Sequence, residues 1–255
     1  MKRLWLLILA GILVLPGCSS PAPPPPAPQA PAFKLDHFKM YAISDVEAQE
    51  TPSITVKDQI LKEPLLITPK KLQYFCTPVA KTYEKKTTKI MDRFAHLAWY
   101  PYPNDIELRT VMYLNQFTNY KRKQLKFNKL EALLAPTEKV DSASRFPGNL
   151  DHYLCYRVTE GSDPEVTVTL EDQFQKTTAN VTGPIFFCVP CSKNDRGQDF
   201  PIKNAADHLA VYSITSGPDI PEEANHLKIN NQFGEQNFKV LRQLYLLVPT
   251  QKIIP

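Results

Sequence analysis

The chain has few glycines and none of the short motifs that mark common catalytic or phosphate-binding sites. Eight glycines in 255 residues leave no glycine-rich phosphate loop, and neither a serine nucleophile elbow nor a His-Glu-x-x-His sequence occurs. Twenty-four prolines and the lack of a long stretch with helical apolar periodicity disfavour helix. No dense basic stripe alternates with aromatic residues, so nucleic acid is not an expected partner.

The N-terminus has the pattern of an export signal. A basic start, Met1-Lys-Arg, precedes an apolar run from Leu4 to Leu15, which is shorter than the ~20 residues that span a bilayer. The run ends in Leu15-Pro16-Gly17-Cys18, which resembles the lipobox of bacterial lipoproteins. The resemblance implies a signal peptide over residues 1–17 and a lipidated Cys18, and Ser19 in place of Asp implies transfer to the outer membrane. The alternative is an ordinary secretory signal that is cleaved nearby.

A proline-rich segment follows this cysteine. Residues 21–31 read Pro-Ala-Pro-Pro-Pro-Pro-Ala-Pro-Gln-Ala-Pro, a composition that favours extended polyproline II at ~3.1 Å per residue. We therefore expect residues 18–33 to form a semi-rigid tether that holds the folded part away from the membrane.

One sequence pattern occurs four times in the rest of the chain. It consists of a His-x-x-x-Tyr segment, an Asp/Asn-Gln pair and a Pro-x-x-Lys segment. The copies begin at His37, His96, His152 and His208, which are 59, 56 and 56 residues apart. Their amide pairs are Asp58-Gln59, Asn115-Gln116, Asp172-Gln173 and Asn231-Gln232, and their lysines are Lys81, Lys139, Lys193 and Lys252. A pattern present in every structural unit is expected to serve the fold.

Alternation of apolar and polar residues predicts that each repeat consists of about four β-strands. Residues 166–171 alternate strictly and are rich in β-branched residues, as in a half-buried strand. One four-stranded unit has exposed edges and little core, whereas two units together supply enough strands for a sandwich or a closed barrel. We predict an all-β fold with two tandem β-sandwich or barrel domains of two pseudo-symmetric repeats each. The domains are expected over residues 34–140 and 150–255, with 141–149 as the linker.

Two cysteines of the third repeat are predicted to form a disulfide. We align Cys155 with Met40, Ala98 and Val211 of the other copies, and Cys188 with Cys76, Leu134 and Leu247. Copy three has cysteine at both positions and copies two and four have apolar residues at both, as expected for two buried positions in contact. Export to an oxidising compartment supports the Cys155–Cys188 bond. It leaves Cys76 and Cys191 either to pair across the domains or to stay free.

The second half of the chain resembles an uncharacterised repeat family of exported bacterial proteins. The family pattern reads Asp-His-Tyr-x-Cys-Tyr, Asp-Gln-Phe and Cys-x-Pro-x-x-Lys, and residues 151–156, 172–174 and 188–193 are similar to it nearly throughout. The resemblance is closer over 150–255 than over 35–140, where Ala95 replaces Asp and Ile60 replaces Phe. It implies the repeat fold and brings with it no activity, ligand or cofactor.

The repeated histidines and amides are predicted to be structural. Zinc needs ligands that converge on one point, and equivalent positions in separate domains do not converge, so we expect no metal. Each histidine is predicted to begin a strand and to hydrogen-bond the Asp/Asn-Gln turn of a neighbouring repeat. Because Asp and Asn interchange among the copies, ionisation is not required there, which argues against acid–base catalysis.

One aromatic and basic cluster belongs to the second repeat alone. It combines Trp99, Tyr100 and Tyr102 with the run Lys121, Arg122 and Lys123. Residues 34–139 contain 18 Lys/Arg and 12 Asp/Glu, a net charge of +6, whereas residues 150–255 have a net charge of −4. Flat rings beside cations suit an anionic glycan or an envelope protein. The alternative interpretation places Trp99 and Tyr100 in the core.

These patterns favour a protein without catalytic activity. We expect an outer-membrane lipoprotein of the cell envelope, without a cofactor, that serves as a structural or interaction module binding protein or glycan. The alternative is an envelope enzyme, either a glycan hydrolase or a thiol oxidoreductase that uses Cys188 and Cys191. The oxidoreductase would need a helix after the Cys-Val-Pro-Cys sequence to lower the first thiol's pKa. Residues 192–197 read Ser-Lys-Asn-Asp-Arg-Gly instead, which is typical of a turn.

Overall fold

The computed structural model of the protein describes residues 33–46, 50–141, 143 and 145–253. The strands are β1 (His37–Ser44), β2 (Ile54–Lys57), β3 (Leu65–Ile67), β4 (Tyr74–Tyr83), β5 (Lys86–Thr88), β6 (His96–Leu114), β7 (Lys123–Lys139), β8 (His152–Glu160), β9 (Val166–Glu171), β10 (Lys176–Asp195), β11 (Gln198–Phe200), β12 (His208–Ile214), β13 (His226–Asn231) and β14 (Gly234–Ile253). The helices among these residues are η1 (Gln116–Thr118) and α1 (Glu222–Asn225). The predicted all-β class is confirmed. The expected signal peptide, Cys18 and nearly all of the tether lie outside the described residues.

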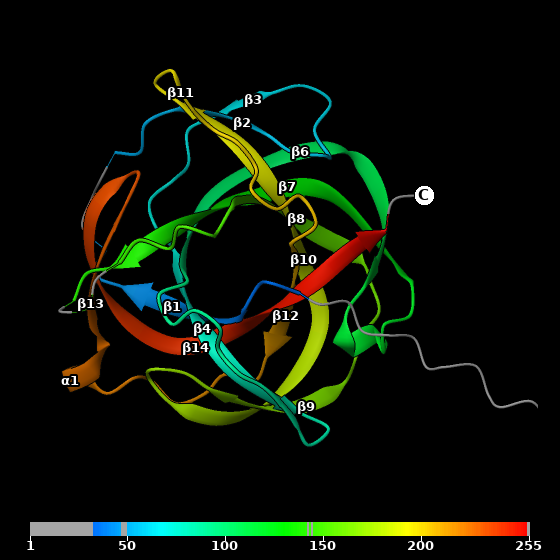
Figure 1. Cartoon of the computed structure of the whole chain (residues 1–255), viewed down its shortest axis with the longest axis vertical. Helices are drawn as coiled ribbons and strands as arrows, with labels where there is room; N and C mark the ends of the chain where they lie inside the picture. The colour runs from blue at the N-terminus through cyan, green and yellow to red at the C-terminus, as the bar shows by residue number, and fades with distance from the viewer. Residues whose placement is uncertain (1–32, 47–49, 142, 144, 254–255) are drawn as a thin grey trace, which may run out of the picture.

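Eight strands close into one antiparallel ring, in the order β1–β4–β6–β7–β8–β10–β12–β14 and back to β1. Every repeat supplies two of them, the strand that begins with the repeated histidine and the strand that carries Pro-x-x-Lys. Figure 1 shows these strands arranged around a common centre. Sandwich and barrel were both predicted, and the ring of strands is closed, as in a barrel. Because the ring is closed, none of its eight strands is a free edge.

The predicted division into domains 34–140 and 150–255 is not confirmed, because strands of the two halves pair with each other. The ring crosses from one half to the other at β7–β8 and at β14–β1. Outer strands cross as well: β2 pairs with β10, β9 with β4, β13 with β7, and the end of β6 with β14. Each repeat thus pairs its outer strand with the repeat two places along the chain. The predicted linker, 141–149, merely connects two neighbouring ring strands.

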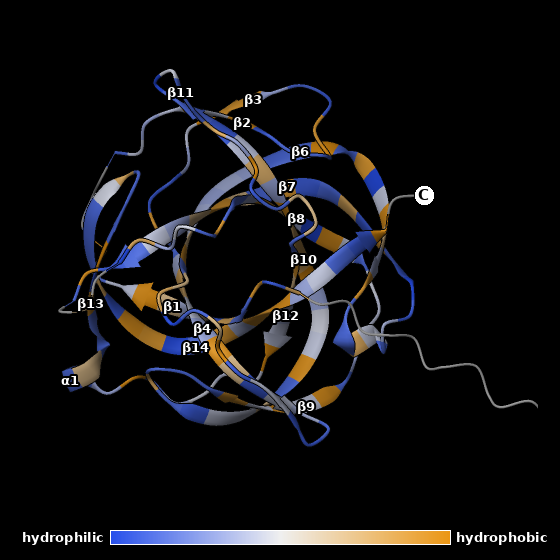
Figure 2. Ribbon diagram, in the orientation of Figure 1, coloured by the Kyte–Doolittle hydropathy of each residue, from blue (hydrophilic) through white to orange (hydrophobic). Residues whose placement is uncertain are grey.

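Side chains of the ring strands alternate between two apolar layers. On β8, Tyr153 and Cys155 belong to a cluster drawn almost entirely from ring strands, whereas Leu154 and Tyr156 belong to a larger cluster that also contains residues of β2, β9 and β13. The first cluster therefore fills the ring, and the second lies between the ring and the outer strands. Figure 2 shows the corresponding apolar segments on ring strands such as β1 and β4.

The inner layer contains the predicted disulfide. Cys155 and Cys188 are directly opposite each other on β8 and β10, and their sulfurs are bonded. The pairs Met40–Cys76 and Val211–Leu247 face each other in the same way in repeats one and four. In repeat two the pair is Trp99–Leu134, so the alignment of Cys155 with Ala98 was shifted by one residue. A shift of one residue moves a side chain to the other face of the sheet.

The remaining described cysteines do not pair across the molecule. Cys76 belongs to the inner layer and Cys191 to the outer layer, and both are free and buried. Burial raises the pKa of both thiols well above the usual value. They are therefore core residues with little thiolate character.

The long strand β10 passes from the outer layer into the ring through a bend at Gly183. Its first part pairs with β9 and its later part with β8 and β12, and the β12 register is irregular between Thr182 and Phe186. Gly183 has φ +101°, and a Cβ there would lie 3.1 Å from the Ile185 nitrogen. Glycine permits this bend because other residues rarely adopt such a φ.

Candidate functional site

The repeated polar residues meet in four equivalent places, which we call histidine nodes. Each node contains the histidine and lysine of one repeat and the glutamine of the next. In node one, His37 Nε2 and Gln116 Nε2 are 2.7 Å apart, and Lys81 donates to Gln116 Oε1. In node three, His152 Nε2 lies 2.8 Å from Gln232 Oε1, to which Lys193 also donates. The predicted bond from histidine to a neighbouring Gln turn is confirmed in these two nodes, which we call closed.

Nodes two and four are open. His96 Nδ1 lies 3.0 Å from the Phe94 carbonyl oxygen, and His208 Nδ1 lies 3.0 Å from that of Ala206. The two imidazoles also stack alike, on Phe75 and Phe187, each with an interplanar angle of 16°. The Nε2 atoms of both histidines are buried and have no hydrogen-bond partner among the described residues. The predicted bond to a Gln turn is therefore absent from the described part of these nodes.

Burial keeps the node histidines neutral. It lowers the pKa of His96 and of His208 to about 4 and that of His152 to about 3, while the pKa of His37 falls well below its usual value. In the open nodes Nδ1 faces a carbonyl oxygen, which can only accept, so Nδ1 carries the proton. Nε2 of His96 and His208 is therefore a lone-pair acceptor without a donor among the described residues.

The Asp/Asn side chains of the motif connect repeats across the ring. Tyr41 donates to Asp172 and Tyr156 donates to Asp58, both at 2.8 Å. In the other two repeats the amide donates instead, from Asn115 to the Tyr212 hydroxyl at 3.0 Å and from Asn231 to the Tyr100 hydroxyl at 2.8 Å. The tyrosine of one repeat thus meets the Asp or Asn of the repeat two places away. The predicted structural role of these amide pairs is confirmed.

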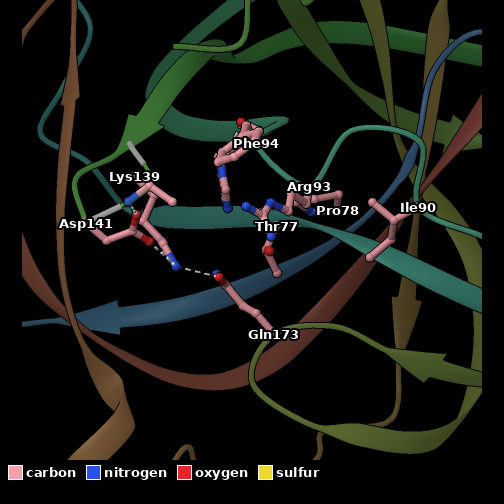
Figure 3. Close-up of a pocket in the computed structure, with 10 residues that line it drawn as sticks. Thr77, Pro78, Ile90, Arg93, Phe94, Lys139, Asp141 and Gln173 are labelled. Carbon is pink, nitrogen blue, oxygen red and sulfur yellow. Dashed lines mark hydrogen bonds and ion pairs between the residues drawn. The ribbon is translucent and has the colours of Figure 1, made fainter. Parts of the chain in front are cut away.

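A cavity of about 280 Å³ opens beside the node of His96 (Figure 3). Its apolar wall consists of Pro78, Ile90 and Phe94, and its polar lining includes Thr77, Arg93, His96, Lys139, Asp141 and Gln173. His96 is 2% exposed and Thr77 is 1% exposed, so both lie deep in the cavity. Gln173 is exposed and lies at its rim.

Basic groups outnumber acidic groups in this cavity. Lys139 Nζ donates to Gln173 Oε1 at 2.7 Å and forms an ion pair of 2.9 Å with Asp141, as Figure 3 shows. Arg93 adds a second cation, and its guanidinium lies 4.8 Å from the centre of the Phe94 ring. With His96 neutral, the lining groups have a net charge of +1.

A second cavity, of about 450 Å³, lies at the closed node of repeat three and is lined by His152, Lys193 and Gln232. His152 and Lys193 already bond Gln232 Oε1 in this node, whereas the buried Gln232 Nε2 has no partner among the described residues. A ligand would have to compete with the two bonds at Oε1, so the second cavity is the weaker candidate.

The aromatic and basic residues predicted for glycan binding do not form one exposed surface. Trp99 is 2% exposed inside the ring, and Tyr100 is fully buried in the outer layer. Tyr102 is half-buried against the same layer. The run of Lys121, Arg122 and Lys123 is exposed but lies at the far end of the β6–β7 hairpin, where Lys123 pairs with Tyr113. The core interpretation of Trp99 and Tyr100 is therefore correct.

The Cys188-Val-Pro-Cys191 sequence does not bring two thiols together. Cys188 points into the ring and is bonded to Cys155, whereas Cys191 belongs to the outer layer. The sequence lies within β10 and continues into the hairpin with β11. A dithiol site at the start of a helix is therefore absent from this segment.

No group of three or more His, Cys, Asp or Glu side chains among the described residues could hold a metal ion. None of the helices in these ranges has the length and apolar character that crossing a bilayer requires.

Sequence reasoning missed the residues that turn node two into a cavity. Ile90, Arg93 and Phe94 lie in the connection between β5 and β6, outside the repeated motif. The motif predicted His96, Lys139 and Gln173 only as scaffold. No periodicity or spacing marks the connection, because its position depends on how the ring closes.

Comparison with known proteins gives one match, to part of the chain. Residues 96–218 match a repeat of unknown function (DUF7450). The match begins at the histidine of repeat two and extends into repeat four, and it brings no activity. No curated protein and no solved structure matches the chain.

Proposed function

We propose that the protein is a non-catalytic lipoprotein of the cell envelope, anchored through Cys18 in the outer membrane, whose folded part binds glycan or protein. The lipobox-like Leu-Pro-Gly-Cys sequence and the proline-rich segment after it support the anchor and the tether. Two acyl chains or more give stable attachment, because each buried methylene contributes ~0.8 kcal/mol.

The observation that carries the binding role is the composition of the cavity at His96. It offers an unpartnered acceptor, two cations and an apolar wall, which are groups that position a ligand. A glycosidase would need two carboxyl groups about 5 to 10 Å apart, whereas Asp141 is the single carboxylate among the described lining residues and is paired with Lys139. The cavity therefore supports binding better than hydrolysis.

Metabolic labelling with a palmitate analogue tests the anchor. We expect the full-length protein to incorporate the label and to sediment with outer membranes, and Cys18→Ala to lose both properties. Cys76→Ala is the matched control, because it removes a different cysteine and leaves the lipobox intact. Equal labelling of the Cys18→Ala variant would refute lipidation at this position.

Crosslinking in intact cells followed by affinity purification tests the interaction role, because it does not presuppose the class of ligand. We expect specific adducts with an envelope protein or glycan from the wild-type protein. The enzyme alternative would be favoured by two results together: no adducts with crosslinkers of any length, and turnover of an envelope glycan by the purified protein.

A further inference from the structure

The starting observation is a buried acceptor that the protein leaves without a donor in its described part. His96 is 2% exposed, and it lines the cavity that Figure 3 shows. Its Nδ1 proton goes to the Phe94 carbonyl oxygen at 3.0 Å. Nε2 therefore requires an N–H or O–H donor, because leaving a buried polar atom unsatisfied is destabilising.

The charges around His96 select the kind of donor. An ammonium donor would be repelled by Lys139 and Arg93, which line the same cavity. A hydroxyl can donate to Nε2 without adding a positive charge. The Lys139 ammonium already donates to Gln173 and pairs with Asp141, which leaves one of its three N–H groups for an anion. The lining has one more cation than anions, which matches a singly charged carboxylate better than a doubly charged phosphate.

The remaining lining and the volume define the size of the ligand. Pro78, Ile90 and Phe94 form an apolar wall suited to the C–H face of a sugar ring. A volume of about 280 Å³ lies at the lower end of the range of ligand pockets, which is roughly 300–1,000 Å³. Such a cavity holds about one ring with its substituents.

We propose that the cavity at His96 binds a carboxylated sugar residue of the uronic acid class. A ring hydroxyl donates to His96 Nε2, and the carboxylate is bound by Arg93 and Lys139. This inference rests on the proposed binding function and specifies its ligand. It adds that the open node of repeat two is a binding site, whereas the closed nodes are scaffold.

Titration calorimetry with D-glucuronate tests the proposal on the mature full chain carrying Cys18→Ala. We expect binding in the millimolar range, which corresponds to about −4 kcal/mol, and clearly weaker binding of D-glucose and of inorganic phosphate. His96→Phe keeps the stacking on Phe75 and removes the Nε2 acceptor together with the Nδ1 bond to Phe94, so it should weaken binding about tenfold. Lys139→Met should weaken it about tenfold or more, because it removes a charged partner.

The chain provides a matched control for each variant. His208 has the same stacking and the same Nδ1 bond as His96, but it lines neither the cavity at His96 nor the cavity at His152. Lys252 is the equivalent of Lys139. His208→Phe and Lys252→Met should leave the affinity unchanged, and thermal unfolding of all four variants checks that they fold.

Three results would overturn the proposal: no heat with glucuronate, equal affinity for glucose or phosphate, or equal losses in the variants and their controls. These results leave the wider binding function intact if crosslinking in cells still yields adducts. Absence of adducts together with retained glucuronate binding would instead refute the partner interaction in cells and keep the site.

Discussion

Nodes one and three contrast with nodes two and four in the same molecule. In the closed nodes, His37 and His152 bond the glutamine of the next repeat. In the open nodes, His96 and His208 have no such partner in the described part of the chain. Both closed nodes join repeats within one half of the chain, and both open nodes lie where one half meets the other. The histidine–glutamine bond therefore links the repeats within each half. At the junctions it is absent from the described residues, although Lys139 still bonds Gln173 at one of them.

Other features follow the same alternation. Asp36 and Asp151 precede the closed-node histidines. Each accepts hydrogen bonds from two backbone N–H groups of the segment that leads into the next repeat. The short strands β5 and β11 form antiparallel hairpins with the ends of β4 and β10, in repeats one and three. The ring of four repeats is thus built from two equivalent pairs, although neither pair is a separate domain.

The strongest test of the contrast separates the halves. Residues 34–140 and 150–255 expressed alone should each lack a cooperative unfolding transition, because each half would leave the ring open and its outer strands without their partners. Co-expression should restore one transition and a one-to-one complex. Circular dichroism and size-exclusion chromatography measure both outcomes. Cooperative unfolding of either half alone would restore the two-domain interpretation.

Acid should destabilise the protein through all four nodes. The folded-state pKa values of the histidines lie below the unfolded value of 6.5, so the unfolded chain binds more protons as the pH falls below 6.5. The free energy of unfolding should decrease by about 1.4 kcal/mol per pH unit for each histidine from pH 6.5 towards pH 4.

Urea unfolding at a series of pH values measures this slope. The raised pKa values of Asp36, Asp58 and Asp207 act in the opposite direction and reduce it. His208→Phe should make the slope shallower. If the variant has the same slope as the wild-type protein, the His208 imidazole of the wild type titrates normally in the folded state.

A comparison of two tyrosines sharpens the difference between the Asp-containing and Asn-containing repeats. Tyr156→Phe removes a hydroxyl that donates to the buried Asp58 carboxyl and should cost about 2–3 kcal/mol. Tyr212→Phe should cost less than about 1 kcal/mol, because Asn115 keeps its bond to Thr250. Chemical denaturation measures both values, and equal costs would contradict this account.

The smallest expected effect comes from the histidines themselves. His152→Phe breaks the bond to Gln232 of a closed node and should cost about 1 kcal/mol at pH 7. His208→Phe removes an unpartnered Nε2 together with the Nδ1 bond to the Ala206 carbonyl oxygen, and it keeps the stacking on Phe187. That oxygen still accepts from the His208 backbone N–H, so the cost should be smaller than for His152→Phe. If the two substitutions cost the same, the open and closed nodes do not differ in energy.

Several local features could be predicted from the sequence, because they depend on short-range pattern. The alternation at 166–171 predicted β9, and the paired substitutions at Cys155 and Cys188 predicted the disulfide. The aromatic cluster failed as a site for a related reason. Trp99 lies opposite Leu134, as Cys155 lies opposite Cys188, so the position is an inner-layer position in every repeat, whatever residue occupies it.

The sequence by itself determined the strands, the four repeats, the disulfide and the structural character of the motif, because residue type and spacing govern burial and strand pairing. Only the tertiary structure decided that the repeats close into one ring and that two nodes are open. It also brought Arg93 and Phe94 of a connecting segment to His96 and Lys139. Identical motif residues make different contacts here because ring closure gives them different neighbours, and those neighbours come from segments without a repeated pattern.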